Sequence, residues 1–109
     1  MHEIIENNKF LISEVCKKHH VKSLHVFGSA RRATDFTDTS DVDLLVTFES
    51  LPTATNDEIF YKVENCDQLH KNLELVLNRK IDLLQEASIK NKFLKYFINK
   101  EKKLLYGLS

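Results

Sequence analysis

The chain has 109 residues, of which 42% are hydrophobic and 29% charged, and sixteen basic residues balance sixteen acidic ones. This composition is typical of a single globular domain over residues 1–109, excludes a disordered chain, and argues against direct nucleic-acid binding, which normally needs a basic excess. No apolar run approaches the ~18 residues that span a membrane, and the N-terminus lacks the apolar core of a signal peptide, so we expect a cytoplasmic protein.

The first half of the chain predicts one helix and two strands. Residues 2 to 20 place apolar side chains at three- and four-residue steps, which predicts a helix. The stretch from Val21 to Phe27 is rich in β-branched and aromatic residues and predicts a strand. Residues 29 to 40 are small and polar, as in a loop. A second strand is predicted from Asp41 to Phe48, and its Leu44–Val46 centre indicates burial on both faces.

The second half predicts a long helix, a short strand and a final helical segment. Thr55 and Glu58 have the spacing of a capping box, so the long helix should begin there. Lys80 to Gln85 reads as a third strand, and one helix or two short ones should follow from Ser88 to Leu105. The apolar residues expected to face inward are Ile59, Phe60, Val63, Cys66, Leu73, Val76 and Leu77 in the long helix, and Ile89, Phe93, Leu94, Phe97 and Ile98 in the last. This order predicts an α/β or α+β domain around a small sheet.

Neither the cysteines nor the histidines are spaced like metal ligands. Cys16 and Cys66 have no CxxC partner and fall on apolar stripes of the predicted helices, so we expect reduced core residues. His19, His20 and His25 lack the spacing of a zinc site and are expected to be surface residues or histidines with satisfied hydrogen bonds.

The segment from Phe27 to Val46 has the clearest chemical meaning. Gly28 ends a strand, and a residue without a Cβ lets the chain turn sharply and a phosphate approach closely. Ser29 offers a hydroxyl, and backbone amides after it would face an anion if a helical turn begins there. Arg31 and Arg32 are candidates to neutralise triphosphate charge, and the sequence leaves open which of them does so.

Three aspartates are candidate metal ligands. Asp41 and Asp43 are two residues apart at the start of a predicted strand, so both carboxylates should project from the same face. Mg²⁺ prefers one or two carboxylates together with phosphate oxygens. In the predicted third strand, Ile81 and Leu83 share one face and Asp82 points to the other. An acid in this otherwise apolar strand is costly unless it is paired or metal-bound. Placed beside the first two, it could accept the proton of an attacking hydroxyl or share a second metal ion.

Together these motifs resemble the small prokaryotic branch of the DNA polymerase β-like nucleotidyltransferases, the minimal nucleotidyltransferases (MNT). The likeness covers nearly the whole chain and is carried by Phe27-Gly28-Ser29, Ser40-Asp41-Val42-Asp43-Leu44, and Arg79 to Leu84. It implies the nucleotidyltransferase fold, with a small mixed sheet of about three to four strands. It also implies that Gly28 and Ser29 bind triphosphate, that Asp41 and Asp43 bind Mg²⁺, and that Asp82 completes the site.

Many members of this family act as antitoxins of HEPN-domain ribonucleases, in some cases by attaching AMP to a tyrosine of the toxin. The resemblance therefore implies a Mg²⁺-dependent adenylyltransferase that uses ATP and forms a hetero-oligomer with a HEPN toxin. Two alternatives stay open at this point. One is a catalytically weak module that neutralises its partner by steric occlusion. The other is nucleotidyl transfer to a small molecule, although such enzymes usually carry an additional domain.

Overall fold

The computed structural model describes the backbone of residues 3–28, 41–49 and 56–107, and the side chains of residues 3–28, 41–49 and 63–107. The helices within these ranges are α1 (Glu3–Glu6), α2 (Lys9–Lys18), α3 (Asn56–Leu77), the short 3₁₀ helix η2 (Glu86–Ser88) and α4 (Lys92–Glu101). The strands are β1 (Val21–Phe27), β2 (Val42–Phe48), β3 (Ile81–Gln85) and β4 (Lys103–Gly107). The α+β class predicted from the sequence is confirmed.

The described strands form one mixed sheet in the order β3-β2-β1-β4. β1 is antiparallel to both β2 and β4, whereas β2 and β3 are parallel and are joined through α3. The antiparallel register pairs Phe27 with Asp43, and the parallel register pairs Asp43 with Asp82. The C-terminal end of β1 and the N-terminal ends of β2 and β3 therefore meet at one edge of the sheet, the edge that runs across the strand ends.

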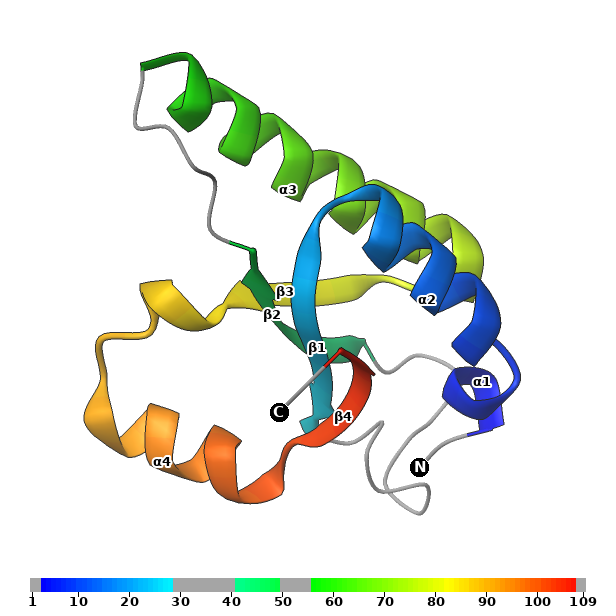
Figure 1. The fold of residues 1–109 in the computed structure, drawn as a ribbon. Coiled ribbons are helices and arrows are strands. Elements are labelled where there is room, and N and C mark those ends of the chain that lie inside the picture. Colours follow the sequence, from blue (N-terminus) through cyan, green and yellow to red (C-terminus); the bar gives the residue numbers. More distant parts are fainter. Residues whose placement is uncertain (1–2, 29–40, 50–55, 108–109) are drawn as a thin grey trace.

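One face of the sheet carries the apolar core. Alternate residues of β2, namely Val42, Leu44 and Val46, point to this face and are fully buried. α1, α2 and α3 cover this face, whereas α4 lies on the other side of the sheet (Figure 1). The remaining members of the core, all at most 2% exposed, are Ile5, Ile12, Cys16, Val21, Leu24, Val26, Leu69, Leu73, Leu77 and Ile81.

The opposite face of the sheet is more polar. The intervening residues of β2 are Asp43, Leu45 and Thr47, of which only Leu45 is fully buried. α4 contributes one buried side chain, Ile98, and this residue does not belong to the core cluster on the helix-covered face. The double burial predicted for the centre of β2 is confirmed, because Leu44, Leu45 and Val46 are each at most 1% exposed.

The helix predicted over residues 2 to 20 is instead two helices that meet at Asn7 and Asn8. The side-chain amide of Asn8 donates to the carbonyl oxygen of Ile4 at 2.7 Å, which is the acceptor that its own backbone N–H would use in a continuous helix. The backbone N–H of Asn8 bonds to Ile5 instead, at 3.2 Å. The asparagine side chain thus ends α1, and α2 begins at Lys9.

The helical segment predicted from Ser88 to Leu105 ends earlier than predicted. α4 stops at Glu101, Lys102 adopts an extended conformation, and Lys103–Gly107 forms β4 along the free side of β1. The leucines that continue the helical spacing of the sequence are thus part of a strand. Pairing with β1 satisfies the backbone groups at an otherwise open sheet edge, and this tertiary gain outweighs local helix propensity.

The prediction of which side chains of the last helix face inward is mostly wrong as well. Phe93, Leu94 and Phe97 are exposed, and Ile98 is the one α4 side chain that is buried. In α3, Leu73 and Leu77 are buried as expected, but Val63 is exposed. The side chains of Ile59 and Phe60, and Thr55 of the predicted capping box, lie outside the part of the chain described.

Among the described residues, none of the helices is both long and apolar enough to cross a membrane. Both cysteines are free thiols, as predicted, with Cys16 buried in the core and Cys66 only partly buried.

Candidate functional site

The end of β1 makes a close approach to the start of β2. Gly28 has a φ of +69°, in the left-handed region that L side chains rarely adopt. A Cβ added at this position would overlap Oδ2 of Asp43. Glycine is thus required at position 28 both for its backbone conformation and because the carboxylate of Asp43 fills the space where a side chain would lie.

Asp43 and Asp82 lie side by side on neighbouring strands. They are register partners in the parallel pair of β2 and β3, where adjacent strands are about 4.8 Å apart. Ile81 and Leu83 pack against the core, so the intervening Asp82 faces the opposite side of the sheet, as Asp43 does. This orientation of Asp82 confirms the alternation predicted from the sequence. Asp41 is exposed and lies one residue before β2 begins.

Asp43 is destabilised in its ionised form by its surroundings. Partial burial, followed by the charges of Asp82 and Asp41, raises the pKa of Asp43 above its ordinary value. Both causes oppose the ionised form of Asp43, and a cation between the carboxylates would relieve both. This is the electrostatic setting expected of a divalent metal site.

The donor chemistry fits Mg²⁺ shared with a phosphate ligand. Within the described ranges, no three His, Cys, Asp or Glu side chains are arranged so that they alone could hold a metal ion. Mg²⁺ does not need such a cage, because it commonly takes one or two carboxylates and completes its coordination with water and substrate phosphates. Asp43 with either of its acidic neighbours supplies such a carboxylate pair.

Four of the candidate residues predicted from the sequence are brought to the same edge of the sheet: Gly28, Asp41, Asp43 and Asp82. The other three, Ser29, Arg31 and Arg32, lie outside the described residues.

A second polar group on this face of the sheet was not foreseen from the sequence. Thr47 donates a hydrogen bond of 2.7 Å to Glu86, and this bond is the main reason why the pKa of Glu86 is lowered. His25 is buried nearby, and burial, reinforced by the charge of Lys102 and opposed by that of Glu86, lowers its pKa. The available signal was the alternation of β1, which puts His25 on the same face as Phe27, the partner of Asp43.

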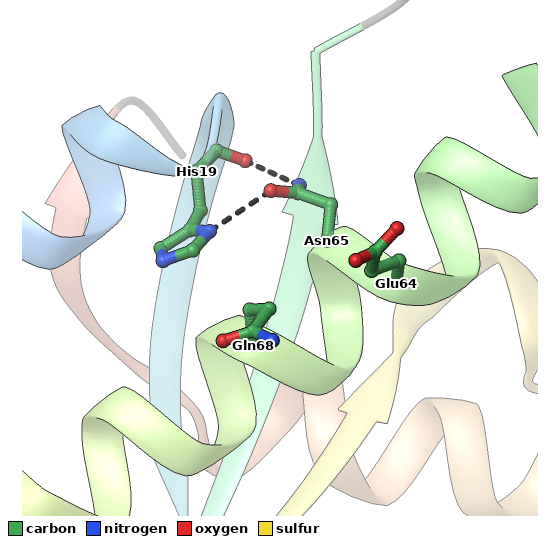
Figure 2. Close-up of a pocket in the computed structure, with 4 residues that line it drawn as sticks. All are labelled: His19, Glu64, Asn65 and Gln68. Atoms are coloured by element: carbon green, nitrogen blue, oxygen red, sulfur yellow. Dashed lines mark hydrogen bonds between the residues drawn. The ribbon is translucent and has the colours of Figure 1, made fainter.

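A shallow pocket at the other end of β1 has a structural explanation. It is lined by His19, Glu64, Asn65 and Gln68, between the end of α2 and the middle of α3 (Figure 2). Asn72 donates to Nε2 of His19 at 2.9 Å, which leaves Nδ1 to donate to Asn65 at 2.9 Å. Asn65 in turn donates to the carbonyl oxygen of His19 at 2.7 Å. His19 is therefore a buried histidine with satisfied hydrogen bonds, as expected, and fastens α2 to α3.

Comparison with known proteins places the chain in a family. Residues 9–105 match the model of the family described as "Nucleotidyltransferase domain". A relative from Methanocaldococcus jannaschii, named "Putative protein adenylyltransferase MJ0128", is 33% identical over 104 residues, which are 95% of this chain and 91% of the relative.

Solved structures share the fold. A structure described as a "putative minimal nucleotidyltransferase" superposes with a TM-score of 0.73 at 25% identity, over 94% of this chain and 95% of that one. A chain from the complex of a tri-AMPylated HEPN toxin of Shewanella oneidensis with an MNT antitoxin superposes with a TM-score of 0.59. It is 19% identical, and the match covers 95% of this chain and 73% of that one. At this identity the likeness to the complex concerns the fold alone.

Proposed function

The chain belongs to the nucleotidyltransferase domain family and is a nucleotidyltransferase, and we propose that it transfers AMP from ATP to a hydroxyl group of a partner protein. The observation that carries this proposal is the register of Asp43 beside Asp82, with Asp41 close enough to affect the same carboxylate. The relative from M. jannaschii, whose name specifies protein adenylyl transfer, supports a protein acceptor.

The acidic residues have separate roles in this proposal. Asp41 and Asp43 hold Mg²⁺, which when bound neutralises phosphate charge and polarises the α-phosphate. Asp82 is exposed on the same face of the sheet and receives the proton of the attacking hydroxyl. Gly28 leaves space for the carboxylate of Asp43, and together with Ser29 it contacts the terminal phosphates. Arg31 or Arg32 adds positive charge to that end of the triphosphate.

The reaction is an in-line displacement at phosphorus. The hydroxyl oxygen of the acceptor attacks the α-phosphorus of ATP, the bond from this phosphorus to the bridging oxygen of the β-phosphate breaks, and pyrophosphate leaves. The hydroxyl proton passes to Asp82. The product is a phosphodiester between AMP and the acceptor. Positioning and electrostatic stabilisation by the aspartates supply the catalysis, since the protein forms no covalent bond of its own.

The acceptor that we propose is a tyrosine of a HEPN-domain ribonuclease toxin, and the chain is then its antitoxin. The complex that shares this fold contains a HEPN toxin carrying three AMP groups, and this supports the choice. We place the reaction in the cytoplasm, where free thiols such as those of Cys16 and Cys66 are stable and ATP is abundant.

The direct test is the intact mass of a HEPN protein encoded beside this chain and co-expressed with it. Co-expression with the wild type should add whole adenylate units to the partner, and the Asp41→Asn, Asp43→Asn double variant should add none. Asp67→Asn is the matched control, because it removes an exposed acid of α3 that forms an ion pair with Lys71, away from the site. This control should modify the partner as the wild type does.

The same experiment tests the first alternative, and a second experiment tests the other. A partner that stays unmodified, co-purifies with the chain and loses its ribonuclease activity would contradict the proposal and indicate steric occlusion. Incubation of the chain with labelled ATP and small hydroxyl compounds tests the other alternative, for which we expect no labelled product.

A further inference from the structure

The outer side of α4 is an apolar surface with no partner in the described part of the chain. Four large side chains on this ten-residue helix are 46–79% exposed, whereas Ile98 alone is buried. We call this set, Phe93, Leu94, Tyr96 and Phe97, the α4 surface. An amphipathic helix in a globular domain normally turns its apolar stripe toward the core. Here most of that stripe faces away from the sheet.

The charge around the α4 surface is strongly positive although the chain as a whole is neutral. Residues 89–107 contain six lysines and one glutamate, and sixteen basic residues balance sixteen acidic ones over the full sequence. Lys92, Lys95 and Lys100 belong to α4 itself and are all exposed. Apolar side chains surrounded by lysines fit a surface of the opposite character, with an apolar centre and a rim of carboxylates.

The α4 surface lies on the side of the sheet that carries the candidate catalytic residues. α4 leads through Lys102 into β4, and the first residue of β4, Lys103, pairs with Val26. The next residue along β1, Phe27, pairs with Asp43. α4 lies on the side of the sheet away from α2 and α3 (Figure 1), and the alternation of β2 and β3 turns Asp43 and Asp82 to that side. A protein that covers α4 would therefore extend toward the aspartates without crossing the sheet.

We propose that the α4 surface is the docking site of the acceptor protein and recognises an apolar patch rimmed by Asp and Glu on that protein. This inference rests on the proposed function, since it gives the acceptor a second point of attachment next to the aspartates. Aromatic side chains at the centre of an interface commonly dominate its binding energy. Docking on α4 would hold the acceptor in place and leave the chemistry to the aspartates.

Two other occupants fit less well. On an anionic membrane, α4 would bring Asp41, Asp43 and Asp82 against lipid phosphates, and like charges would repel. A second copy of this chain could offer the acidic α3, but α3 and α4 are different surfaces, and such a head-to-tail contact generates rings or filaments rather than a closed pair.

The test uses the full chain, its co-expressed HEPN partner, and two pairs of double variants. Phe93→Ser, Phe97→Ser removes the centre of the α4 surface, and Phe10→Ser, Leu75→Ser is the control, because both of its residues are exposed on other helices. Lys90→Glu, Lys92→Glu reverses charge at the start of α4, and Lys18→Glu, Lys22→Glu makes the same change on exposed residues elsewhere. All four should keep the wild-type Tm within a few degrees, because exposed substitutions change stability little.

Loss of the aromatic pair should raise KM for the acceptor about tenfold or more and change kcat little, because the catalytic aspartates are intact. Charge reversal should slow association and weaken its dependence on salt. Both control variants should stay within about twofold of wild type. Unchanged KM in the Phe93→Ser, Phe97→Ser variant would overturn the inference.

Further readouts separate this inference from the proposed function. If the wild type binds the partner without modifying it, and the Phe93→Ser, Phe97→Ser variant no longer binds, the proposed function fails and the docking site stands. Sedimentation of the isolated wild type as an oligomer that this variant dissociates would assign α4 to self-association and overturn the inference. Binding to vesicles of phosphatidylcholine and phosphatidylserine that this variant loses would overturn it in favour of a membrane.

Discussion

On the face of the sheet covered by α2 and α3, the strand residues are hydrophobic: seven of them are at most 2% exposed, and Phe48, Leu83, Leu105 and Tyr106 are partly buried against them. On the face toward α4, the same strands present Asp43, Asp82 and Thr47 and the buried imidazole of His25. β2 serves both faces, since Val42, Leu44 and Val46 alternate with Asp43, Leu45 and Thr47. One face therefore contributes mainly to stability, and the other gives up stability to keep carboxylates close together.

This comparison predicts opposite effects for neighbouring residues of one strand. An acid that is partly buried beside two other acids weakens the fold, and its removal should stabilise the protein while destroying its activity. A leucine one position further along should behave in the reverse way.

The largest effect is expected for Asp43→Asn. Transfer of AMP should fall by about a thousandfold or more, which corresponds to about 4 kcal/mol of activation free energy. The Tm should rise by a few degrees, because the neutral amide does not suffer from burial or from the charges of Asp82 and Asp41. Transfer assays and thermal melting check the two halves. Near-normal transfer by Asp43→Asn would show that Asp43 is not a catalytic residue. The control Asp67→Asn should change neither AMP transfer nor Tm.

Leu44→Ala should cost about 2–5 kcal/mol of unfolding free energy, because it opens a cavity in the fully buried core. Urea unfolding measures this loss. The folded fraction should still transfer AMP, since Leu44 points away from the aspartates. Leu75→Ala on the exposed side of α3 is the control, with an expected change of about 0.5 kcal/mol or less. A similar loss at both positions would mean that the core has been misassigned.

Gly28→Ala and Gly107→Ala separate strain from function. Both glycines have positive φ, and a Cβ would overlap Oδ2 of Asp43 at the first and the carbonyl oxygen of Lys22 at the second. Each substitution should destabilise the chain by about 1–2 kcal/mol or more. Only Gly28→Ala should also reduce transfer, by about tenfold, because it displaces the carboxylate of Asp43. The transfer rate is compared at saturating ATP and per folded molecule. An equal loss of this rate in Gly28→Ala and Gly107→Ala would refute this role of Gly28.

The smallest effect concerns pH. The pKa of His25 is lowered in the folded protein, so between that lowered value and the ordinary 6.5 the unfolded chain binds more protons. Unfolding free energy should therefore increase with pH across this window and level off above 6.5. Urea unfolding at pH 5 and pH 7.5 should show this difference in the wild type and a smaller one in His25→Gln. An unchanged pH dependence in His25→Gln would assign the effect to other groups.

Much of the sheet could be predicted from local sequence. β1 was predicted with its observed bounds and β3 to within one residue, because β-branched and aliphatic runs have a period that differs from that of helices. The orientation of Asp82 followed from the same alternation. β4 was missed because its leucines continue the helical spacing of α4, and only the open edge of β1 reveals the alternative pairing.

Other features depend on information that local sequence does not contain. Amphipathic spacing in α4 correctly indicates an apolar stripe, but it does not say whether the sheet or another molecule covers that stripe. The approach of Gly28 to Asp43 depends on how two distant segments pair. Nothing in the sequence around Asn8 indicates that its side chain donates a hydrogen bond to the carbonyl oxygen of Ile4 and ends the helix.

The parallel pairing of β2 with β3 has a consequence for how such chains can vary. Backbone hydrogen bonds set the position of Asp82 opposite Asp43, so the length of the α3 crossover does not affect it. Insertions in the crossover can thus accumulate without separating the two acids. A slip of one residue, by contrast, would turn Asp82 toward the aliphatic core and abolish the pair at once. Tolerance to length changes and intolerance to register changes therefore coexist within the same βαβ unit.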